Sequence, residues 1–264
     1  MKNAARWLGA FLGSVFLVSA CRDAGVAGKP EGIVGGIGLT RITVYDQRPA
    51  PDGLHSGAPY MRAVTDEGFY VIGGTGRIEL HDVHYGFRSI NLSPGRYVQI
   101  PPCTLHRLID TDHLVVLSVT GSAGPAAKND ARIYFGQVVD EHPAEYDRLA
   151  GLAEAEGLEG ALKRRDEAVR AYGAFFELWK FDKVAYYKEL ERFAGLHLNA
   201  VAAKRNEFDG AAGAAAWTAF FRARLKNLPL NRDELPPVFH FPAETETPGM
   251  NGLLLPVTNL ATIK

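Results

Sequence analysis

The sequence predicts a mainly β protein with a helical extension: an antiparallel jelly-roll barrel in residues 39–140, followed by a helical region in residues 141–228. From Leu39 onward, side chains alternate between two faces with the two-residue period of a strand. Short segments rich in β-branched and aromatic residues then recur, separated by turns that contain Gly or Pro. After residue 140, apolar residues recur at helical spacing instead.

The predicted strands lie close together in the sequence, at residues 39–45, 69–72, 77–81, 87–92, 97–100, 114–120 and 132–135. Parallel strands need crossover connections of a dozen or more residues, and most of these gaps leave no room for them. The strands are therefore predicted to pair antiparallel. A jelly roll is the arrangement that closes two such sheets on each other and leaves few exposed edges.

Four helices are predicted after the barrel. The first begins at Pro143, a residue favoured at the first helical position, and ends at Gly157. The third begins after Asp182, a suitable N-cap, and the second and fourth have apolar faces that include Trp179 and Trp217. Such stripes are typical of core packing, so each helix is predicted to pack on another helix or on the outside of the barrel.

Two further segments of the C-terminal half have less specific patterns. The charged run at residues 163–166 is predicted to be a solvated helix face. Residues 229–264 are rich in Pro, Gly and Thr, and they are predicted to form either an extended arm laid across the body or a partly disordered tail.

The first twenty residues are predicted to be a lipoprotein signal peptide. Lys2 and Arg6 precede an uncharged apolar run that is too short to span a membrane. The sequence LVSAC at residues 17–21 resembles a bacterial lipobox, in which Cys21 would carry the lipid; the alternative is an ordinary secretory signal. The resemblance implies a protein of the bacterial cell envelope that binds the membrane through a lipid on Cys21. The residue after the cysteine, Arg22, resembles that of lipoproteins sorted to the outer membrane. This resemblance implies an outer-membrane protein that faces the periplasm.

Composition and charge narrow the classes of partner. Of 264 residues, 47% are hydrophobic, which supports a sizeable core. Residues 21–38 are rich in Gly, which predicts a flexible linker. The formal net charge is -1, and acidic and basic residues alternate without a basic stripe, so nucleic acid is not a predicted partner. If Cys21 is lipidated, Cys103 is the only other cysteine, which excludes an intramolecular disulfide.

One stretch of the predicted barrel has a motif-like pattern. Residues Tyr60 and Arg62 precede Glu67, and the segment GRYVQIPPCTLH ends at His106. These residues resemble the two sequence motifs of the cupin superfamily, which implies a cupin-like jelly roll. In that family two histidines at i and i+2, a glutamate and a further histidine commonly hold a divalent metal. Glu67 and His106 match, whereas Tyr60 and Arg62 replace the two histidines.

The order of a cupin-like barrel and a helical extension resembles uncharacterised bacterial cupin-domain proteins. The resemblance is good from about residue 57 to residue 140, fainter to about residue 179 and absent beyond. It implies little about a reaction, and the homodimer common among cupin-like barrels is implied only by analogy.

The two substitutions argue against the usual metal cage. A phenol such as that of Tyr60 is a poor ligand at neutral pH, and the guanidinium of Arg62 repels a cation. Glu67 and His106 alone rarely hold a divalent metal. No cofactor is therefore predicted, while a divalent metal stays an alternative if other ligands are recruited.

Cys103 is the first candidate for such a ligand, because it lies three residues before His106. The competing interpretation is that Cys103 occupies a glycine position of the motif as a small buried residue. Three histidines are further candidates: His55, His81 and His84. His81 and His84 flank a predicted hairpin turn and are expected to face water.

Arg62 leaves two interpretations open. A cation inside a barrel must be paired, so Arg62 is predicted to form either a structural salt bridge with Glu67 or a binding site for an anion. In the second case Tyr60 would donate a hydrogen bond, and His106 or Glu67 would transfer protons.

The leading hypothesis is a module that binds or senses a small, anionic molecule through Tyr60, Arg62, Glu67 and His106. One alternative is a metal-dependent cupin enzyme of the dioxygenase or sugar isomerase type, with Cys103 added to Glu67 and His106. The other is a structural envelope lipoprotein that acts through its helical tail. No nucleophile elbow or dinucleotide fingerprint is present, so catalysis is left open.

Overall fold

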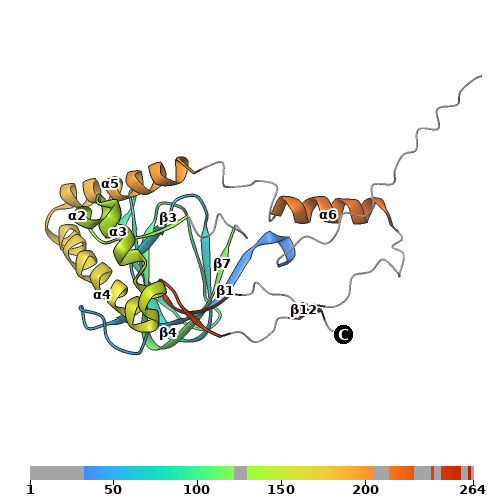
Figure 1. Cartoon of the computed structure of the whole chain (residues 1–264), viewed down its shortest axis with the longest axis horizontal. Helices are drawn as coiled ribbons and strands as arrows, with labels where there is room; N and C mark the ends of the chain where they lie inside the picture. Colours follow the sequence, from blue (N-terminus) through green and yellow to red (C-terminus); the bar gives the residue numbers. More distant parts are fainter. Residues whose placement is uncertain are drawn as a thin grey trace, which may run out of the picture.

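Antiparallel pairing joins ten strands into one strongly curved sheet that forms a barrel (Figure 1). The computed structural model describes residues 33–121, 130–204, 214–228, 239–240, 245–256 and 261–262. The strands of the sheet are β1 (Gly38–Val44), β2 (His55–Ser56), β3 (Tyr60–Arg62), β4 (Glu67–Asp82), β5 (Gly86–Leu92), β6 (Tyr97–Ile100), β7 (Leu105–Thr120), β8 (Ala131–Ile133), β10 (Thr247–Pro248) and β11 (Gly252–Pro256). Two further short strands, β9 (Phe239–His240) and β12 (Ala261–Thr262), pair with each other.

The two longest strands, β4 and β7, form the centre of the sheet and are longer than predicted. Residues 69–72 and 77–81 belong to one strand, whose pairing with β7 shifts register between Val71 and Gly76. At Gly74 the φ angle is +66°, and a Cβ there would lie 2.1 Å from the carbonyl oxygen of His113. Glycine lets the strand bend here without ending. Gly74, which predicts a turn in the sequence, therefore forms part of a β-bulge.

The barrel core follows from strand alternation. Along β7, Leu114 and Val116 are buried, while the residues that follow each of them, Val115 and Leu117, are only partly covered. Buried residues of β1, β4, β5 and β6 join them in one apolar cluster. The predicted jelly-roll barrel with a helical extension is therefore confirmed.

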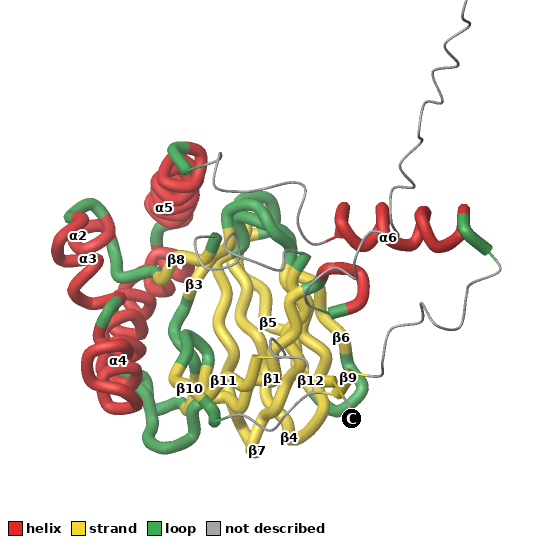
Figure 2. Tube along the Cα trace, turned by 45° about the vertical axis from the view of Figure 1, so that its right-hand side comes forward, coloured by secondary structure: helices red, strands yellow, loops and turns green. Residues whose placement is uncertain are grey.

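Helices cover one side of the barrel (Figure 2). They are α2 (Gln137–Asp140), α3 (Pro143–Ala150), α4 (Leu152–Phe181) and α5 (Lys183–Ala202). Aromatic side chains of α4 and α5, including Phe175 and Phe193, pack with Met61 and Leu105 of the barrel. The prediction that these apolar faces form core is confirmed.

Helix boundaries agree with the capping signals in part. The Asp182 carboxylate accepts the backbone N–H of Ala185 at 3.0 Å, as expected for the N-cap of α5. Gly157 interrupts the helical path with a φ of +61°, but the chain resumes its helix within α4. The first predicted helix is thus divided between α3, which ends before Gly151, and the start of α4.

The prediction of a solvated face at residues 163–166 is wrong for two of its residues. Arg164 and Arg165 are buried, and the Arg165 side chain is completely covered. Arg164 donates to the carbonyl oxygens of Ala150 and Gly249 at 2.9 and 2.8 Å. Arg165 donates to Asp166 and to the carbonyl oxygen of Arg48. These bonds replace water, so the two cations attach α4 to loops of the barrel.

The C-terminal segment supplies an arm that becomes part of the barrel. Strand β11 pairs with β1, with Leu254 opposite Ile42, and β10 pairs with β11. Residues 247–248 and 252–256 are thus strands of the barrel sheet. The same strand order leaves β1 enclosed between β7 and β11, so residues from both ends of the described chain complete the sheet.

The remaining helix, α6 (Ala214–Lys226), lies apart from the barrel and contacts the short 3-10 turn η1 (Val34–Gly36) (Figure 1). Among the described residues, none of the helices has the length and apolar character needed to cross a membrane. The predicted signal peptide at 1–20, the lipidation residue Cys21 and the first part of the linker lie outside the described residues.

Candidate functional site

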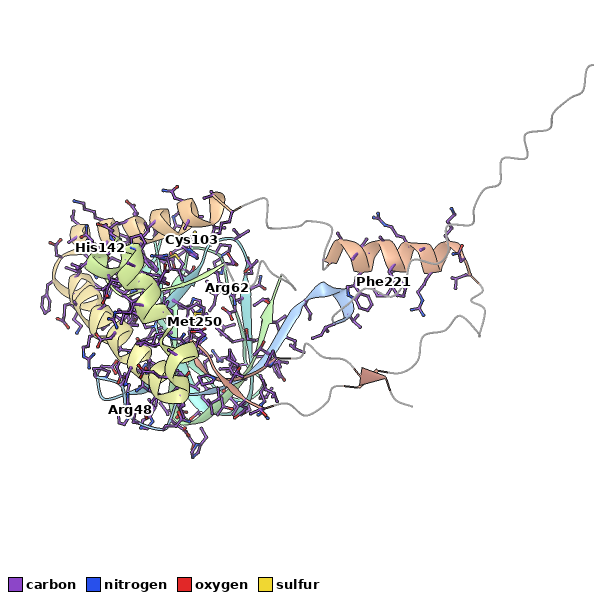
Figure 3. All side chains as sticks on the ribbon, viewed as in Figure 1. Arg48, Arg62, Cys103, His142, Phe221 and Met250 are labelled. Atoms are coloured by element: carbon purple, nitrogen blue, oxygen red, sulfur yellow. The ribbon has the colours of Figure 1, made fainter. Side chains whose placement is uncertain are left out.

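Four predicted site residues meet at one end of the barrel. Strand β3 carries Tyr60 and Arg62, Glu67 is the first residue of β4, and His106 is the second residue of β7. Tyr60 lies directly opposite His106 in the strand pairing, and their ring centroids are 4.2 Å apart. Figure 3 shows Arg62 and Cys103 at this end of the barrel, and the Cys103 N–H donates to the Arg62 carbonyl oxygen at 2.8 Å.

The Glu67 carboxylate is the centre of the site. Its Oε2 accepts hydrogen bonds from the Tyr60 hydroxyl at 2.7 Å and from Arg62 Nε at 2.8 Å. Its Oε1 accepts from the Ser118 hydroxyl at 2.7 Å. The predicted Arg62–Glu67 ion pair is present, and Glu67 is almost fully buried. Three donors thus replace the water that the carboxylate loses on burial.

These contacts set the protonation of two groups. Burial alone would raise the pKa of Glu67, but His106 and Arg62 together offset it and hold that pKa well below its usual value. Burial, reinforced by the Glu67 charge, raises the pKa of Tyr60 well above its usual value. Glu67 therefore stays ionised and Tyr60 stays protonated at neutral pH, which makes Glu67 a weak proton acceptor.

His106 has one nitrogen engaged and one free. Its Nδ1 lies 2.9 Å from the carbonyl oxygen of Thr104, which can only accept, so Nδ1 carries the proton. Its Nε2 lies 3.7 Å from Glu67 Oε2, too far for a hydrogen bond. In the neutral ring Nε2 is an acceptor, and in the charged ring it is a second donor.

Arg62 also keeps one nitrogen without a hydrogen bond. Its Nη1 lies 3.8 Å from Oδ2 of Asp130, and Asp130 itself accepts the backbone N–H groups of Ala63, Val64 and Thr65. Among the described residues, neither Arg62 Nη1 nor His106 Nε2 has a hydrogen-bond partner, although both atoms are buried. Two unsatisfied nitrogens therefore lie beside one satisfied carboxylate.

A residue that the sequence analysis missed completes the site. Asn251, in the turn before β11, donates from Nδ2 to the Tyr60 hydroxyl at 2.8 Å. Because Tyr60 donates its own proton to Glu67, its oxygen must accept here, which fixes the orientation of the Asn251 amide. The hydroxyl of Tyr60 is then fully used, so it is not free to donate to a ligand. No motif signalled Asn251, which lies 191 positions from Tyr60 in the chain.

The structure positions that turn with buried groups. The carbonyl oxygen of Gly249 accepts hydrogen bonds from the Tyr45 hydroxyl and from Arg164 of α4, each at 2.8 Å. The Ala58 N–H donates to the carbonyl oxygen of Met250 at 2.9 Å. Arg164 of α4, Tyr45 after β1 and Ala58 before β3 thus hold the turn that contains Asn251 beside the site.

Cys103 adopts the backbone conformation expected at a glycine position. Its φ is +60°, in the left-handed region that glycine favours. The side chain is half-buried, and its Sγ lies 3.8 Å from the carbonyl oxygen of Ala63. It packs at the edge of the cluster that joins the barrel to α4 and α5. These features agree with a small packing residue.

The expectation that His81 faces water is wrong. Its side chain is completely buried, with Nδ1 2.9 Å from the Tyr186 hydroxyl and Nε2 2.6 Å from the Tyr172 hydroxyl. The neighbouring residue Leu80 pairs with His106 in the β4–β7 register, so Leu80 and His106 share the inner face. His81 therefore points outward, toward the helices, and away from Glu67. His84 is exposed, as predicted.

The residues of the site do not fit a divalent metal. The guanidinium of Arg62 binds the carboxylate oxygen that would be a ligand, so a fixed positive charge already lies beside it. Across the part of the chain that the structure describes, no group of three or more His, Cys, Asp or Glu residues is arranged to hold a metal ion.

No protein-family model and no curated protein matches the sequence. Solved structures resemble parts of it. PAC13 from Streptomyces, solved with uridine, shares 15% identity over 39% of this chain and 70% of its own, with a TM-score of 0.28. The capsular polysaccharide assembling protein CapF from Staphylococcus aureus shares 15% identity over 40% of this chain and 29% of its own, with a TM-score of 0.30.

A cupin-2 domain containing protein from Shewanella frigidimarina shares 19% identity over 33% of this chain and 72% of its own, with a TM-score of 0.27. Identities and TM-scores of this size carry no information on activity. The barrel of this chain is described by its own strand order and register.

Proposed function

We propose that this chain is a lipid-anchored protein of the bacterial cell envelope whose cupin-like barrel binds a small molecule with an anionic group. The lipid on Cys21 and the location at the outer membrane, facing the periplasm, are inferred from residues 17–22. The binding function is inferred from the site between β3, β4 and β7.

The pair of unsatisfied nitrogens in the site carries this proposal. A buried polar atom without a partner costs free energy, about 1–3 kcal/mol, so Arg62 Nη1 and His106 Nε2 would both gain from a ligand. Arg62 keeps 11% of its side chain exposed, so the residue lies near the border between the barrel interior and solvent. Glu67 has no such need, because three donors already satisfy it.

The free guanidinium nitrogen identifies the class of ligand. Arg62 Nη1 lies 3.8 Å from Asp130 Oδ2 and has no hydrogen-bond partner among the described residues. A small carboxylate would accept from Arg62 Nη1, and His106 Nε2 would contact the same ligand.

Thermal unfolding of residues 21–264, with Cys21→Ser to prevent lipidation, tests this proposal. Each of acetate, lactate, citrate and benzoate is added, with chloride at equal ionic strength as the reference. A ligand at a hundredfold excess over its Kd should stabilise the protein by about 2.7 kcal/mol, which raises Tm by several degrees.

Two arginine variants locate the effect. Arg62→Lys keeps the charge but loses the planar fork, and we expect it to remove most of the ligand-dependent shift. Arg88→Lys is the matched control, because Arg88 pairs with Asp82 at the surface. Equal shifts in both variants, or no shift with any carboxylate, would contradict a barrel site. In that case the Arg62–Glu67 pair is a structural cross-link.

A further inference from the structure

Helix α6 combines a buried face with an exposed apolar edge. Trp217 and Phe220 are covered, 3% and 5% exposed, and the helix contacts η1. Phe221 and Leu225 follow on the adjacent side and are 45% and 71% exposed. Leu228, just past the helix, is 58% exposed, and Val34 of η1 is 66% exposed. We call these four exposed residues, Val34, Phe221, Leu225 and Leu228, the α6 edge.

The positions of the edge residues place them together. Residues 221 and 225 are four positions apart in α6, which puts them on one stripe of the helix, and Leu228 follows two residues after the helix ends. Figure 3 shows α6 apart from the barrel, with Phe221 on the side of the helix that faces η1. The apolar stripe is therefore carried by a part of the molecule that stands away from the barrel.

The charges around the edge have one sign. Arg222, Arg224 and Lys226 lie on α6, whereas residues 210–231 contain no Asp or Glu. The whole chain has a formal charge of -1, so this concentration of cations is local. The guanidinium of Arg224 lies 4.9 Å from the centroid of the Phe220 ring, which keeps a cation at the border of the apolar face.

We propose that α6 and η1 together bind an anionic phospholipid surface, with the α6 edge inserted among the headgroups. A helix with aromatic and aliphatic residues on one side and Arg and Lys beside them is the pattern of an interfacial helix. Cations near an anionic membrane surface add attraction, whereas an acidic protein partner would not account for the exposed apolar stripe.

The position of η1 gives this surface a role. It begins at Val34, thirteen residues after Cys21, so a lipid on Cys21 would hold η1 and α6 close to the membrane along the chain. The α6 edge would then add a second contact with the headgroups. This role rests on the proposed lipid anchor, but the surface itself does not.

Vesicle sedimentation tests the surface without the lipid. Residues 21–264 with Cys21→Ser are mixed with vesicles of phosphatidylcholine and phosphatidylglycerol in equal amounts, or of phosphatidylcholine alone. We expect partitioning into the anionic vesicles to be at least about tenfold stronger, as three cations allow. Leu225→Asp should abolish it, while Phe181→Asp, at a residue of α4 that is 82% exposed, should leave it unchanged.

Charge variants separate electrostatic from apolar binding. Arg222→Gln with Lys226→Gln should lower the binding to anionic vesicles about tenfold or more. Arg148→Gln with Arg170→Gln removes the same charge from exposed positions of α3 and α4, and it should have little effect. Circular dichroism of each variant verifies that it is folded.

Three results would overturn the proposal. They are an absence of vesicle binding, equal binding to both vesicle types, and a dimer in light scattering that Leu225→Asp dissociates without lipid. The last result would assign the edge to a second copy of the chain. Because the protein is unlipidated and no carboxylate is added, none of these outcomes bears on the anchor or on the barrel ligand.

Discussion

His81 of the barrel and Tyr172 of α4 share a hydrogen bond of 2.6 Å across the boundary between sheet and helices. The Tyr172 hydroxyl donates its proton to Glu79 Oε2 at 3.0 Å, so its oxygen accepts from His81 Nε2. His81 Nδ1 is then an acceptor for the Tyr186 hydroxyl. The network therefore fixes a neutral His81 with its proton on Nε2.

This network predicts a loss of stability in acid. Burial, with a contribution from Arg107, lowers the pKa of His81 to about 3, compared with about 6.5 for an exposed histidine. A lowered pKa means that protons favour the unfolded chain, so stability is complete above pH 6.5 and falls as pH drops toward 3. The slope attributable to His81 is at most about 1.4 kcal/mol per pH unit.

Urea unfolding from pH 7.5 to 4 checks this prediction. Other groups also titrate in this range, including Asp140, whose pKa burial raises to about 6. The informative quantity is thus the difference between the wild type and His81→Gln, which cannot be protonated. The difference should shrink as pH falls. A difference that is constant with pH would mean that His81 has the same pKa in the folded and the unfolded protein.

Restoring the two histidines should restore a metal site. In Tyr60→His with Arg62→His, the cation beside Glu67 is removed and two ligands are added on the inner face of β3. We expect the double variant to bind Zn²⁺ or Ni²⁺ and to be stabilised by about 2.7 kcal/mol at a hundredfold excess over Kd. Thermal unfolding with metal and elemental analysis after dialysis measure this.

The single variant Arg62→Met serves as the control for that experiment, because it removes the cation without adding a ligand. Stoichiometric metal in the wild type that disappears in His106→Ala would show that the interpretation of Tyr60 and Arg62 is wrong.

Asn251→Ala should destabilise the protein by about 1–3 kcal/mol. It removes the donor to Tyr60 in a buried site, and the phenol oxygen loses its partner. Tyr60→Phe should cost a similar amount, because Glu67 then loses one of its donors. The double variant should cost clearly less than the sum, because the two residues share one bond. Urea unfolding of all three proteins measures the coupling, and additive losses would contradict the shared bond.

Gly252→Ala should separate the C-terminal arm from the barrel. A Cβ at Gly252 would lie 1.9 Å from the carbonyl oxygen of Thr43, an atom of the β1 backbone that cannot move aside. We expect a loss of several kcal/mol, as for other overpacked sites. Gly195→Ala is the matched control on α5, where a Cβ meets nothing within 4 Å. It should stabilise the protein by about 0.5–1 kcal/mol.

Limited proteolysis of both proteins completes the comparison. Cleavage near residue 250 should accelerate only in Gly252→Ala. Equal cleavage rates would mean that β11 tolerates the added methyl group.

Local patterns were sufficient to predict the barrel and its helical extension, and they singled out Tyr60, Arg62, Glu67 and His106, which the strands bring together. Alternation along β1, β5 and β6 and the cap at Asp182 depend on neighbours in the chain, and each was found. The pairing of Arg62 with Glu67 followed from the cost of an unpaired buried cation.

Long-range contacts account for what the sequence did not reveal. Arginine is usually a surface residue. Hydrogen bonds to carbonyl oxygens of a distant loop explain why Arg165 is buried. His81 faces the helices because of a register that the turn signals could not fix. Asn251 reaches the site through an arm that has no motif of its own.

The enclosure of β1 between β7 and β11 has a consequence for how this protein folds during synthesis. Thr43 of β1 pairs with Leu253, so the pairing closes a loop of roughly 210 residues. Contacts of such long separation form slowly, and β11 is synthesised well after β1. The edge of β1 therefore stays open until β11 has left the ribosome, and the site around Glu67 is completed only then.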